Sequence, residues 1–157
     1  MLECMIIGDS IAVGVAMHRP ECEVYAKGGI NTAQFGKIYA DKILEAKTVI
    51  ISVGSNDHQY VPTNYELLKI RGRISADRVY WIMPYGNLKE SNVPIERIQA
   101  MVSKIANTMG DGVIHFTPSP DGIHPAASEY RRIAKVATNT EDKENDERDA
   151  GKHYRPY

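Results

Sequence analysis

The sequence predicts an α/β fold, a three-layer sandwich in which helices cover both faces of a central five-stranded parallel sheet. Two observations lead to this prediction. Short apolar runs of strand length occur five times along the chain, and TVIISV (48–53) is the clearest of them. Segments whose apolar residues recur at helical spacing separate these runs, and strands that alternate with helices indicate βαβ units and a parallel sheet.

The N-terminal part of the chain contains three of the expected strands and two of the expected helices. LECMII (2–7) is a short apolar strand, and a brief helix is expected over 11–17. CEVYA (22–26) is predicted as the second strand. Residues 32–46 carry apolar side chains at helical spacing and are predicted as a helix. The β-branched run 48–53 follows, as expected for a strand buried on both faces.

The C-terminal part continues the same alternation. Residues 64–75 are predicted as a helix, and RVYWIM (78–83) as a strand that a proline closes. Residues 94–109 begin with a proline, which suits the first turn of a helix, and their apolar residues recur at helical spacing. GVIHF (112–116) is the fifth strand, and the last helix is expected over 126–137. Five such strands favour the flavodoxin-like order 2-1-3-4-5.

Length and composition fit one domain, expected over residues 1–138, because the chain has 157 residues and 43% of them are hydrophobic. Residues 139–157 are highly charged and almost without aliphatic side chains, so a flexible tail is expected there. The net charge of −1 argues against a nucleic-acid partner. The longest apolar runs have the length of strands, far below that of a membrane span.

Two cysteines, Cys4 and Cys22, are too few for a disulfide framework, and neither belongs to a CxxC pair. We therefore expect two reduced, buried thiols. The N-terminal residues lack a basic n-region, so no signal peptide is expected. Together these points make the cytoplasm the default expectation for localisation, with a phage-encoded or particle-borne protein as an alternative.

Glycines and polar residues follow every predicted strand. In open parallel sheets ligands bind at the carboxyl ends of the strands, so these segments should meet at one edge. The five segments are Gly8–Ser10, Lys27–Asn31, Gly54–Asp57, Pro84–Asn87 and Asp121–Pro125.

The residues at this edge suit acyl transfer, which needs a nucleophile, a base, a group that orients the base, and donors for an oxyanion. Ser10 in its turn can act as the nucleophile, His124 as the base, and Asp121 as the group that orients the imidazole. The backbone N–H groups of Ser10 and Gly29 and the side-chain amide of Asn56 can serve as oxyanion donors.

Four sequence blocks resemble those of the SGNH hydrolases, also called GDSL-type esterases and lipases. They are GDS (8–10), the glycines at 28–29, GSND (54–57) and DGIHP (121–125), in that order. The resemblance extends over residues 2–137. It implies the nucleophile, oxyanion-donor and triad roles given above for the same residues, with Gly28 as an alternative to Gly29. It also implies structural roles for the two remaining carboxylates of these blocks, Asp9 and Asp57.

The resemblance implies a serine esterase that forms an acyl-enzyme on Ser10 and needs neither cofactor nor metal. We expect short-chain ester substrates, including O-acetyl esters of carbohydrates or small alcohols. His58 and Tyr85 are candidates for the rim of the substrate site, with Tyr60 and Asn87 as similar candidates.

Four alternatives are open at this point. The chain could be an inactive binding or structural module with this fold, or an O-acyltransferase that passes the acyl group to a sugar hydroxyl. A metal-dependent phosphoesterase would use ligands drawn from Asp9, Asp57, Asp121 and His124. A flavin or nucleotide binder is disfavoured, because Asp9 in the first turn would repel a phosphate.

Overall fold

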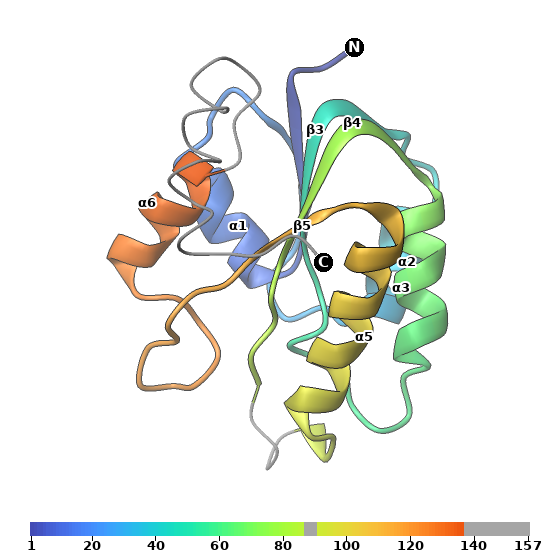
Figure 1. The fold of residues 1–157 in the computed structure, drawn as a ribbon, viewed down its shortest axis with the longest axis vertical. Helices are drawn as coiled ribbons and strands as arrows, with labels where there is room; N and C mark the ends of the chain where they lie inside the picture. The colour runs from blue at the N-terminus through green and yellow to red at the C-terminus, as the bar shows by residue number, and fades with distance from the viewer. Residues whose placement is uncertain (87–90, 137–157) are drawn as a thin grey trace.

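The computed structural model describes residues 1–86 and 91–136, and it has the predicted α/β architecture. All five strands are parallel, in the order β2-β1-β3-β4-β5. The strands are β1 (Cys4–Gly8), β2 (Glu23–Ala26), β3 (Leu44–Ser52), β4 (Ile74–Ile82) and β5 (Gly112–Ile114). The helices are α1 (Ser10–Ala16), α2 (Thr32–Ile38), α3 (Thr63–Gly72), α5 (Ile95–Met109) and α6 (Ala127–Val136). Helices α1 and α6 cover one face of the sheet, and α2, α3 and α5 cover the other (Figure 1).

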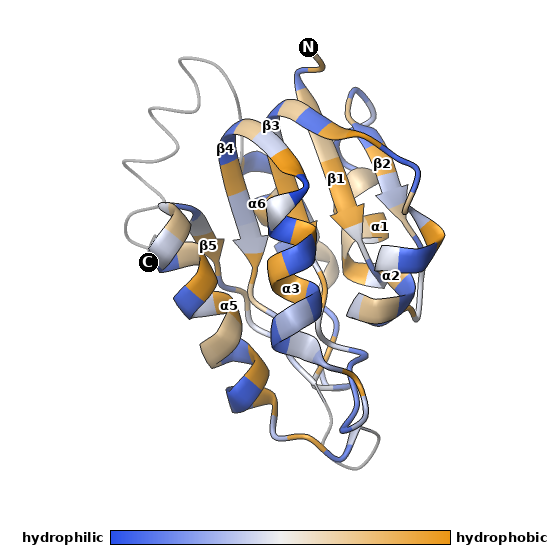
Figure 2. Cartoon of the chain, turned by 90° about the vertical axis from the view of Figure 1, so that its right-hand side faces the viewer, coloured by the Kyte–Doolittle hydropathy of each residue, from blue (hydrophilic) through white to orange (hydrophobic). Residues whose placement is uncertain are grey.

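Two apolar clusters lie on the two faces of the sheet, and the central strands contribute to both. Along β1, Met5 and Ile7 belong to the cluster under α2, α3 and α5, whereas Cys4 and Ile6 belong to the one under α1 and α6. Neighbouring side chains of a strand point to opposite faces, so a strand covered on both sides must be apolar throughout. Figure 2 shows β1 accordingly as a continuous hydrophobic element.

Two helices are shorter in the structure than the sequence predicts. Helix α2 ends at Ile38 rather than at residue 46, and α3 ends at Gly72 rather than at residue 75. Residues 44–46 and 74–75, predicted as the ends of these helices, instead form the first parts of β3 and β4, where Leu44 pairs with Ile74. Cross-strand pairing and burial of Leu44 therefore override the helical spacing of this stretch. Strand β5 ends at Ile114, so the half-buried His115 lies just beyond it.

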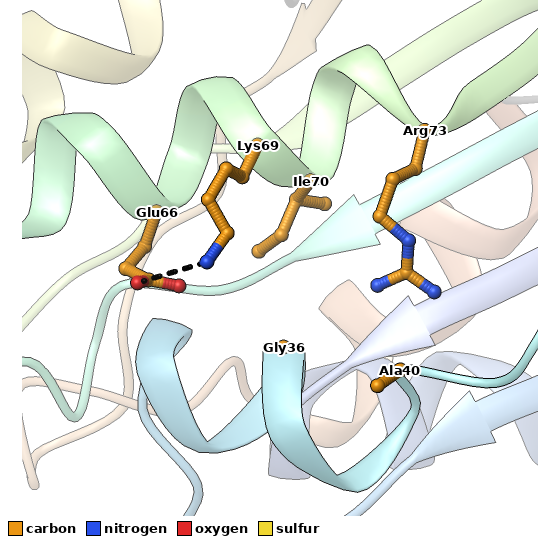
Figure 3. A pocket seen from close by; sticks show the side chains of 6 residues that line it. All are labelled: Gly36, Ala40, Glu66, Lys69, Ile70 and Arg73. Atoms are coloured by element: carbon orange, nitrogen blue, oxygen red, sulfur yellow. Dashed lines mark ion pairs between the residues drawn. The ribbon is translucent and has the colours of Figure 1, made fainter.

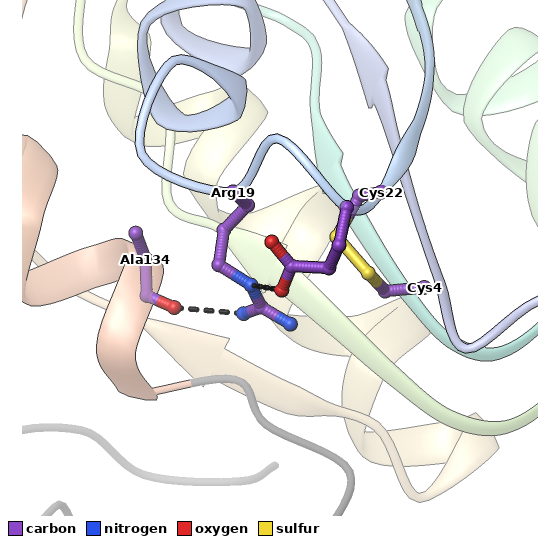
Figure 4. Close-up of a disulfide and its surroundings, with 5 residues drawn as sticks. Cys4, Arg19, Cys22 and Ala134 are labelled. Atoms are coloured by element: carbon purple, nitrogen blue, oxygen red, sulfur yellow. Dashed lines mark hydrogen bonds and ion pairs between the residues drawn. A yellow bond between two sulfur atoms is a disulfide. The ribbon is translucent and has the colours of Figure 1, made fainter.

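The expectation of two free thiols is wrong, because Cys4 and Cys22 form a disulfide (Figure 4). Strands β1 and β2 pair in parallel with Met5 opposite Glu23, which puts the two preceding residues side by side. Their Cα atoms are 4.8 Å apart, within the range that a disulfide spans. The thiol argument for a cytoplasmic protein therefore fails.

Arg19 connects the loop before β2 to helix α6. Its guanidinium forms an ion pair with Glu21 at 2.8 Å and donates a hydrogen bond to the carbonyl of Ala134 in α6 at 2.8 Å (Figure 4). Within the described residues, no helix has the length and apolarity needed to cross a membrane. The predicted tail, residues 139–157, lies outside the described residues.

Candidate active site

Ser10 is the first residue of α1 and follows β1 after a single turn residue. The turn needs Gly8, whose φ is +137° and where a Cβ would lie 1.8 Å from the carbonyl oxygen of Ser52. The N–H of Asp9 donates to that same oxygen at 2.9 Å. Because β1 passes so close to β3 and then turns at once into a helix, Ser10 lies at the carboxyl edge of the sheet.

The side chain of Asp9 points into the protein instead of toward this edge. It is fully buried, and Oδ1 accepts hydrogen bonds from the N–H of Ile11 at 3.0 Å and from Ser52 Oγ at 3.1 Å. The other oxygen, Oδ2, is buried without a hydrogen-bond partner among the described residues. Burial therefore raises the pKa of Asp9 to about 6, although the hydrogen bonds oppose the shift. Asp9 caps α1 and supports the turn that carries Ser10.

Asp121 and His124 lie together in the loop before α6. Asp121 Oδ1 accepts hydrogen bonds from the backbone N–H groups of Ile123 at 2.7 Å and His124 at 2.8 Å. Its Oδ2 lies 2.8 Å from His124 Nδ1. The backbone hydrogen bonds, together with the bond to the imidazole, hold the pKa of Asp121 well below its usual range. A carboxylate fixed in this way orients the imidazole.

The structure brings Ser10 and His124 together across 114 positions of sequence, with Ser10 Oγ 2.9 Å from His124 Nε2. Close packing of α1 on α6 makes this possible. The ring of Tyr130 lies against Gly14, where an added Cβ would be 2.3 Å from the ring. In a neutral imidazole whose Nδ1–H donates to Asp121, the Nε2 lone pair faces the hydroxyl of Ser10.

The expected oxyanion donors lie on two neighbouring segments. Gly28 is next to Ser10, since a Cβ added to it would lie 3.8 Å from the Cβ of Ser10. Gly29 has a φ of +79° and open space around its Cα. Asn56 uses one side-chain N–H to donate to the carbonyl of Ile30 at 3.0 Å, which ties its amide to the segment that contains both glycines.

Asp57 is buried beneath these two segments, and its carboxylate accepts three hydrogen bonds. Oδ1 accepts from the N–H of Thr32 at 2.8 Å. Oδ2 accepts from the hydroxyls of Thr32 at 2.6 Å and Thr63 at 2.7 Å. Burial raises the pKa of Asp57, and these hydrogen bonds oppose the rise. Neither threonine was among the residues expected at the site, although each is the first residue of a helix, where a hydroxyl commonly bonds to nearby groups.

The metal alternative needed the side chains of Asp9, Asp57, Asp121 and His124 to converge. Asp9 and Asp57 instead point into the protein, while His124 lies between Asp121 and Ser10. Among the described residues, the one group of three side chains at metal-ligand spacing is Cys4, Glu21 and Cys22. Both of its sulfurs form the disulfide, so the arrangement lends the metal alternative no geometric support.

The expected rim residues differ in their surroundings. His58 is exposed in the loop that follows Asn56, and its ring meets the ring of Tyr60, which is 82% exposed, at 6.1 Å. Tyr85 is half-buried, with its ring edge-on to Phe116 at 4.8 Å. Asn87 lies outside the described residues.

A separate cavity of about 240 Å³ lies between α2 and α3 (Figure 3). Its charged side chains are used in helix packing: Lys69 forms an ion pair with Glu66 at 3.5 Å, and Arg73 donates to the carbonyls of Tyr39 and Lys42. None of the described residues that were expected at the site lines this cavity.

No family model matches the sequence, and no curated protein matches it. Among solved structures, the chain is similar to the C-terminal catalytic domain of peptidoglycan O-acetyltransferase A from Streptococcus pneumoniae, described with a methylsulfonyl adduct. The identity is 15%, the match covers 99% of this chain and 98% of that domain, and the TM-score is 0.60. It is also similar to a proposed acylhydrolase from Bacteroides fragilis, at 18% identity over 85% of this chain and 83% of that one, again with a TM-score of 0.60. These likenesses show the fold and agree with the α/β architecture expected from the alternation of strands and helices.

Proposed function

We propose that this protein is a serine esterase that cleaves short-chain esters through an acyl-enzyme on Ser10. The observation that carries the proposal is the hydrogen-bonded chain from Ser10 Oγ to His124 Nε2, at 2.9 Å, and from His124 Nδ1 to Asp121 Oδ2, at 2.8 Å. A nucleophile within hydrogen-bond reach of a base, which a third group orients, is the arrangement that acyl transfer requires. The likeness to an acetyltransferase domain and a proposed acylhydrolase supports acyl-ester chemistry in general.

In the first half of the proposed reaction, Ser10 Oγ forms a bond to the carbonyl carbon of the ester as its proton moves to His124 Nε2. The bond between that carbon and the alcohol oxygen then breaks, and the alcohol leaves with the proton from His124. In the second half, water attacks the acyl-enzyme with His124 again as the base, which releases the carboxylic acid and restores Ser10. Asp121 stabilises the imidazolium in both halves.

The proposed oxyanion donors are the N–H of Ser10, the N–H of Gly29 and the amide of Asn56, with Gly28 as the alternative glycine. Ser10 begins α1, so its N–H belongs to the first turn, where backbone donors have no intrahelical acceptor. Asn56 has a second side-chain N–H besides the one that donates to Ile30.

Short acyl groups are favoured because the proposed site opens to solvent. The side chains of His124 and Asp121 are 40% and 49% exposed, which leaves little apolar wall for a long chain at this position. We expect turnover of p-nitrophenyl acetate to exceed that of p-nitrophenyl palmitate, and Ser10→Ala to abolish it without lowering the melting temperature. A preference for palmitate contradicts the proposed acyl-group size, and an active Ser10→Ala protein contradicts the mechanism.

A second candidate is O-acyl transfer, favoured by the likeness to the acetyltransferase domain over nearly the full length of this chain. The same acyl-enzyme would then be attacked by a sugar hydroxyl in place of water. Incubation with p-nitrophenyl acetate and a soluble oligosaccharide distinguishes the two, because transfer yields an acetylated sugar that mass spectrometry detects. Release of acetate alone favours hydrolysis.

A further inference from the structure

The two segments that carry the proposed oxyanion donors are joined through one buried carboxylate. Asp57 lies in the loop after β3, directly after Asn56, and its side chain has no exposed surface. It bonds to the backbone and hydroxyl of Thr32, which comes three residues after Gly29, and to the hydroxyl of Thr63. The same carboxylate therefore anchors the start of α2, the start of α3 and the loop of Asn56.

These contacts limit how the two segments can move relative to each other. Besides the bonds to Asp57, the amide of Asn56 donates to the carbonyl of Ile30, one residue after Gly29. Helix α2 begins with a capping box between Asn31 and Gln34, whose two reciprocal hydrogen bonds of 2.9 Å hold the first turn of the helix. Helix α3 has no side-chain cap, so its tie to this loop through Thr63 depends on Asp57.

We propose that Asp57 is a positioning residue, which fixes the segment of Gly29 against the loop of Asn56 so that their N–H groups are in place before the substrate binds. This inference rests on the proposed function, because the positioned groups matter for turnover only if they stabilise an oxyanion. Asp57 itself does not touch the reacting atoms.

The carboxylate form suits this task better than an amide. Three donors converge on its two oxygens, and a carboxylate only accepts. An asparagine would keep one acceptor for the N–H of Thr32. Its NH₂ group, however, would face the two threonine hydroxyls, which would then have to accept hydrogen bonds instead of donating them. Bonds to a charged acceptor are also roughly twice as strong as bonds between neutral groups.

A purely structural role for Asp57 would lower stability but leave the folded protein with an unchanged kcat. A positioning role lowers kcat and leaves KM nearly unchanged, because oxyanion donors act mainly on the transition state. Misplacement of a catalytic group by about 1 Å can cost about 100-fold in rate. We therefore expect a loss of about 100-fold in kcat for Asp57→Asn and of about 10-fold for the milder Thr32→Val.

The experiment measures kcat and KM for p-nitrophenyl acetate in wild type, Asp57→Asn, Thr32→Val and Thr63→Val. Valine keeps the shape of threonine and removes only the hydroxyl, so the two valine variants decide the question if Asp57→Asn does not fold. Thr108→Val is the matched control, because it removes a hydroxyl hydrogen bond of 2.8 Å from the outer side of α5. Circular dichroism at the assay temperature verifies that each variant is folded.

A double-mutant cycle tests whether Asp57 acts through the donors. In an Asn56→Ala background, where one donor is already missing, Thr32→Val should lower kcat less than it does in wild type. Folded Asp57→Asn, Thr32→Val and Thr63→Val proteins with wild-type kcat would overturn the inference, as would a rise in KM alone. If the wild type itself turns over no ester, the proposed function fails and the inference fails with it. If the wild type is active and the variants keep its kcat, only the inference about Asp57 fails.

Discussion

The disulfide between Cys4 and Cys22 should make a measurable contribution to stability. It joins the beginning of β1 to the residue before β2, at a sequence separation of 18. Closing a loop of this size restricts the unfolded chain and stabilises the fold by about 3 kcal/mol in the chain-entropy model. For a chain of this length, 1 kcal/mol corresponds to roughly 2–4 °C in melting temperature, so reduction should lower the melting temperature by about 6–12 °C.

The assay compares thermal unfolding of the wild type with and without reductant, followed by circular dichroism. A Cys4→Ala, Cys22→Ala double variant is the control and should unfold at one temperature in both buffers. Thiol titration of the denatured protein, before reduction, should detect no free thiol. Two free thiols before reduction would contradict the disulfide. A wild-type melting temperature that stays the same after complete reduction of the disulfide would contradict its contribution to stability.

Two other predictions concern the turn and the helix that carry Ser10. Burial raises the pKa of Asp9 from 3.8 to about 6, so between these values the folded state keeps a proton that the unfolded state releases. Stability from this group is therefore present below about pH 4 and lost as the pH rises through 6, by about 3 kcal/mol. Urea unfolding of wild type and Asp9→Asn should show curves that diverge across this range, and parallel curves would contradict the assignment. Gly14→Ala should destabilise the protein by about 1–3 kcal/mol, because its Cβ would occupy the position of the Tyr130 ring. It should lower ester turnover as well, since α6 follows the loop of His124; full stability and activity in this variant would argue against the close α1–α6 contact.

The sheet and its strand order could be predicted because apolar runs of strand length alternate along the chain with segments of helical spacing. The boundaries between α2 and β3 and between α3 and β4 could not. Leu44 and Ile74 fit the helical spacing of the segments before them, and only their pairing with each other across the sheet decides otherwise. That contact is between residues far apart in the chain, where local periodicity carries no information.

The disulfide was missed for a related reason. Two cysteines alone say little, although the predicted strands 2–7 and 22–26 contain both and are neighbours in the order 2-1-3-4-5. Only the register in the structure, with Met5 opposite Glu23, puts Cys4 beside Cys22. The strand order does not fix this register, so the pairing of the two cysteines could not be predicted from it. Counting cysteines without that register led to the wrong expectation.

The structure brings Ser10, His124 and Asp121 into hydrogen-bond contact at the edge of the sheet where the sequence placed them, and their catalytic roles stay predictions. The contacts of Asp57 could not be foreseen. Thr32 and Thr63 have no distinctive neighbours in sequence, and they reach Asp57 only because α2 and α3 begin on either side of its loop.

Covalent labelling can test whether Ser10 is the nucleophile of an ester-cleaving site. The protein is treated with an organophosphonate, the adduct is located by peptide mass spectrometry, and p-nitrophenyl acetate turnover is followed in the same samples. We predict one adduct per chain, on Ser10, with turnover lost in proportion to labelling and no adduct in Ser10→Ala. Turnover that persists in fully labelled protein, or an adduct on another residue with Ser10 unmodified, would contradict the account.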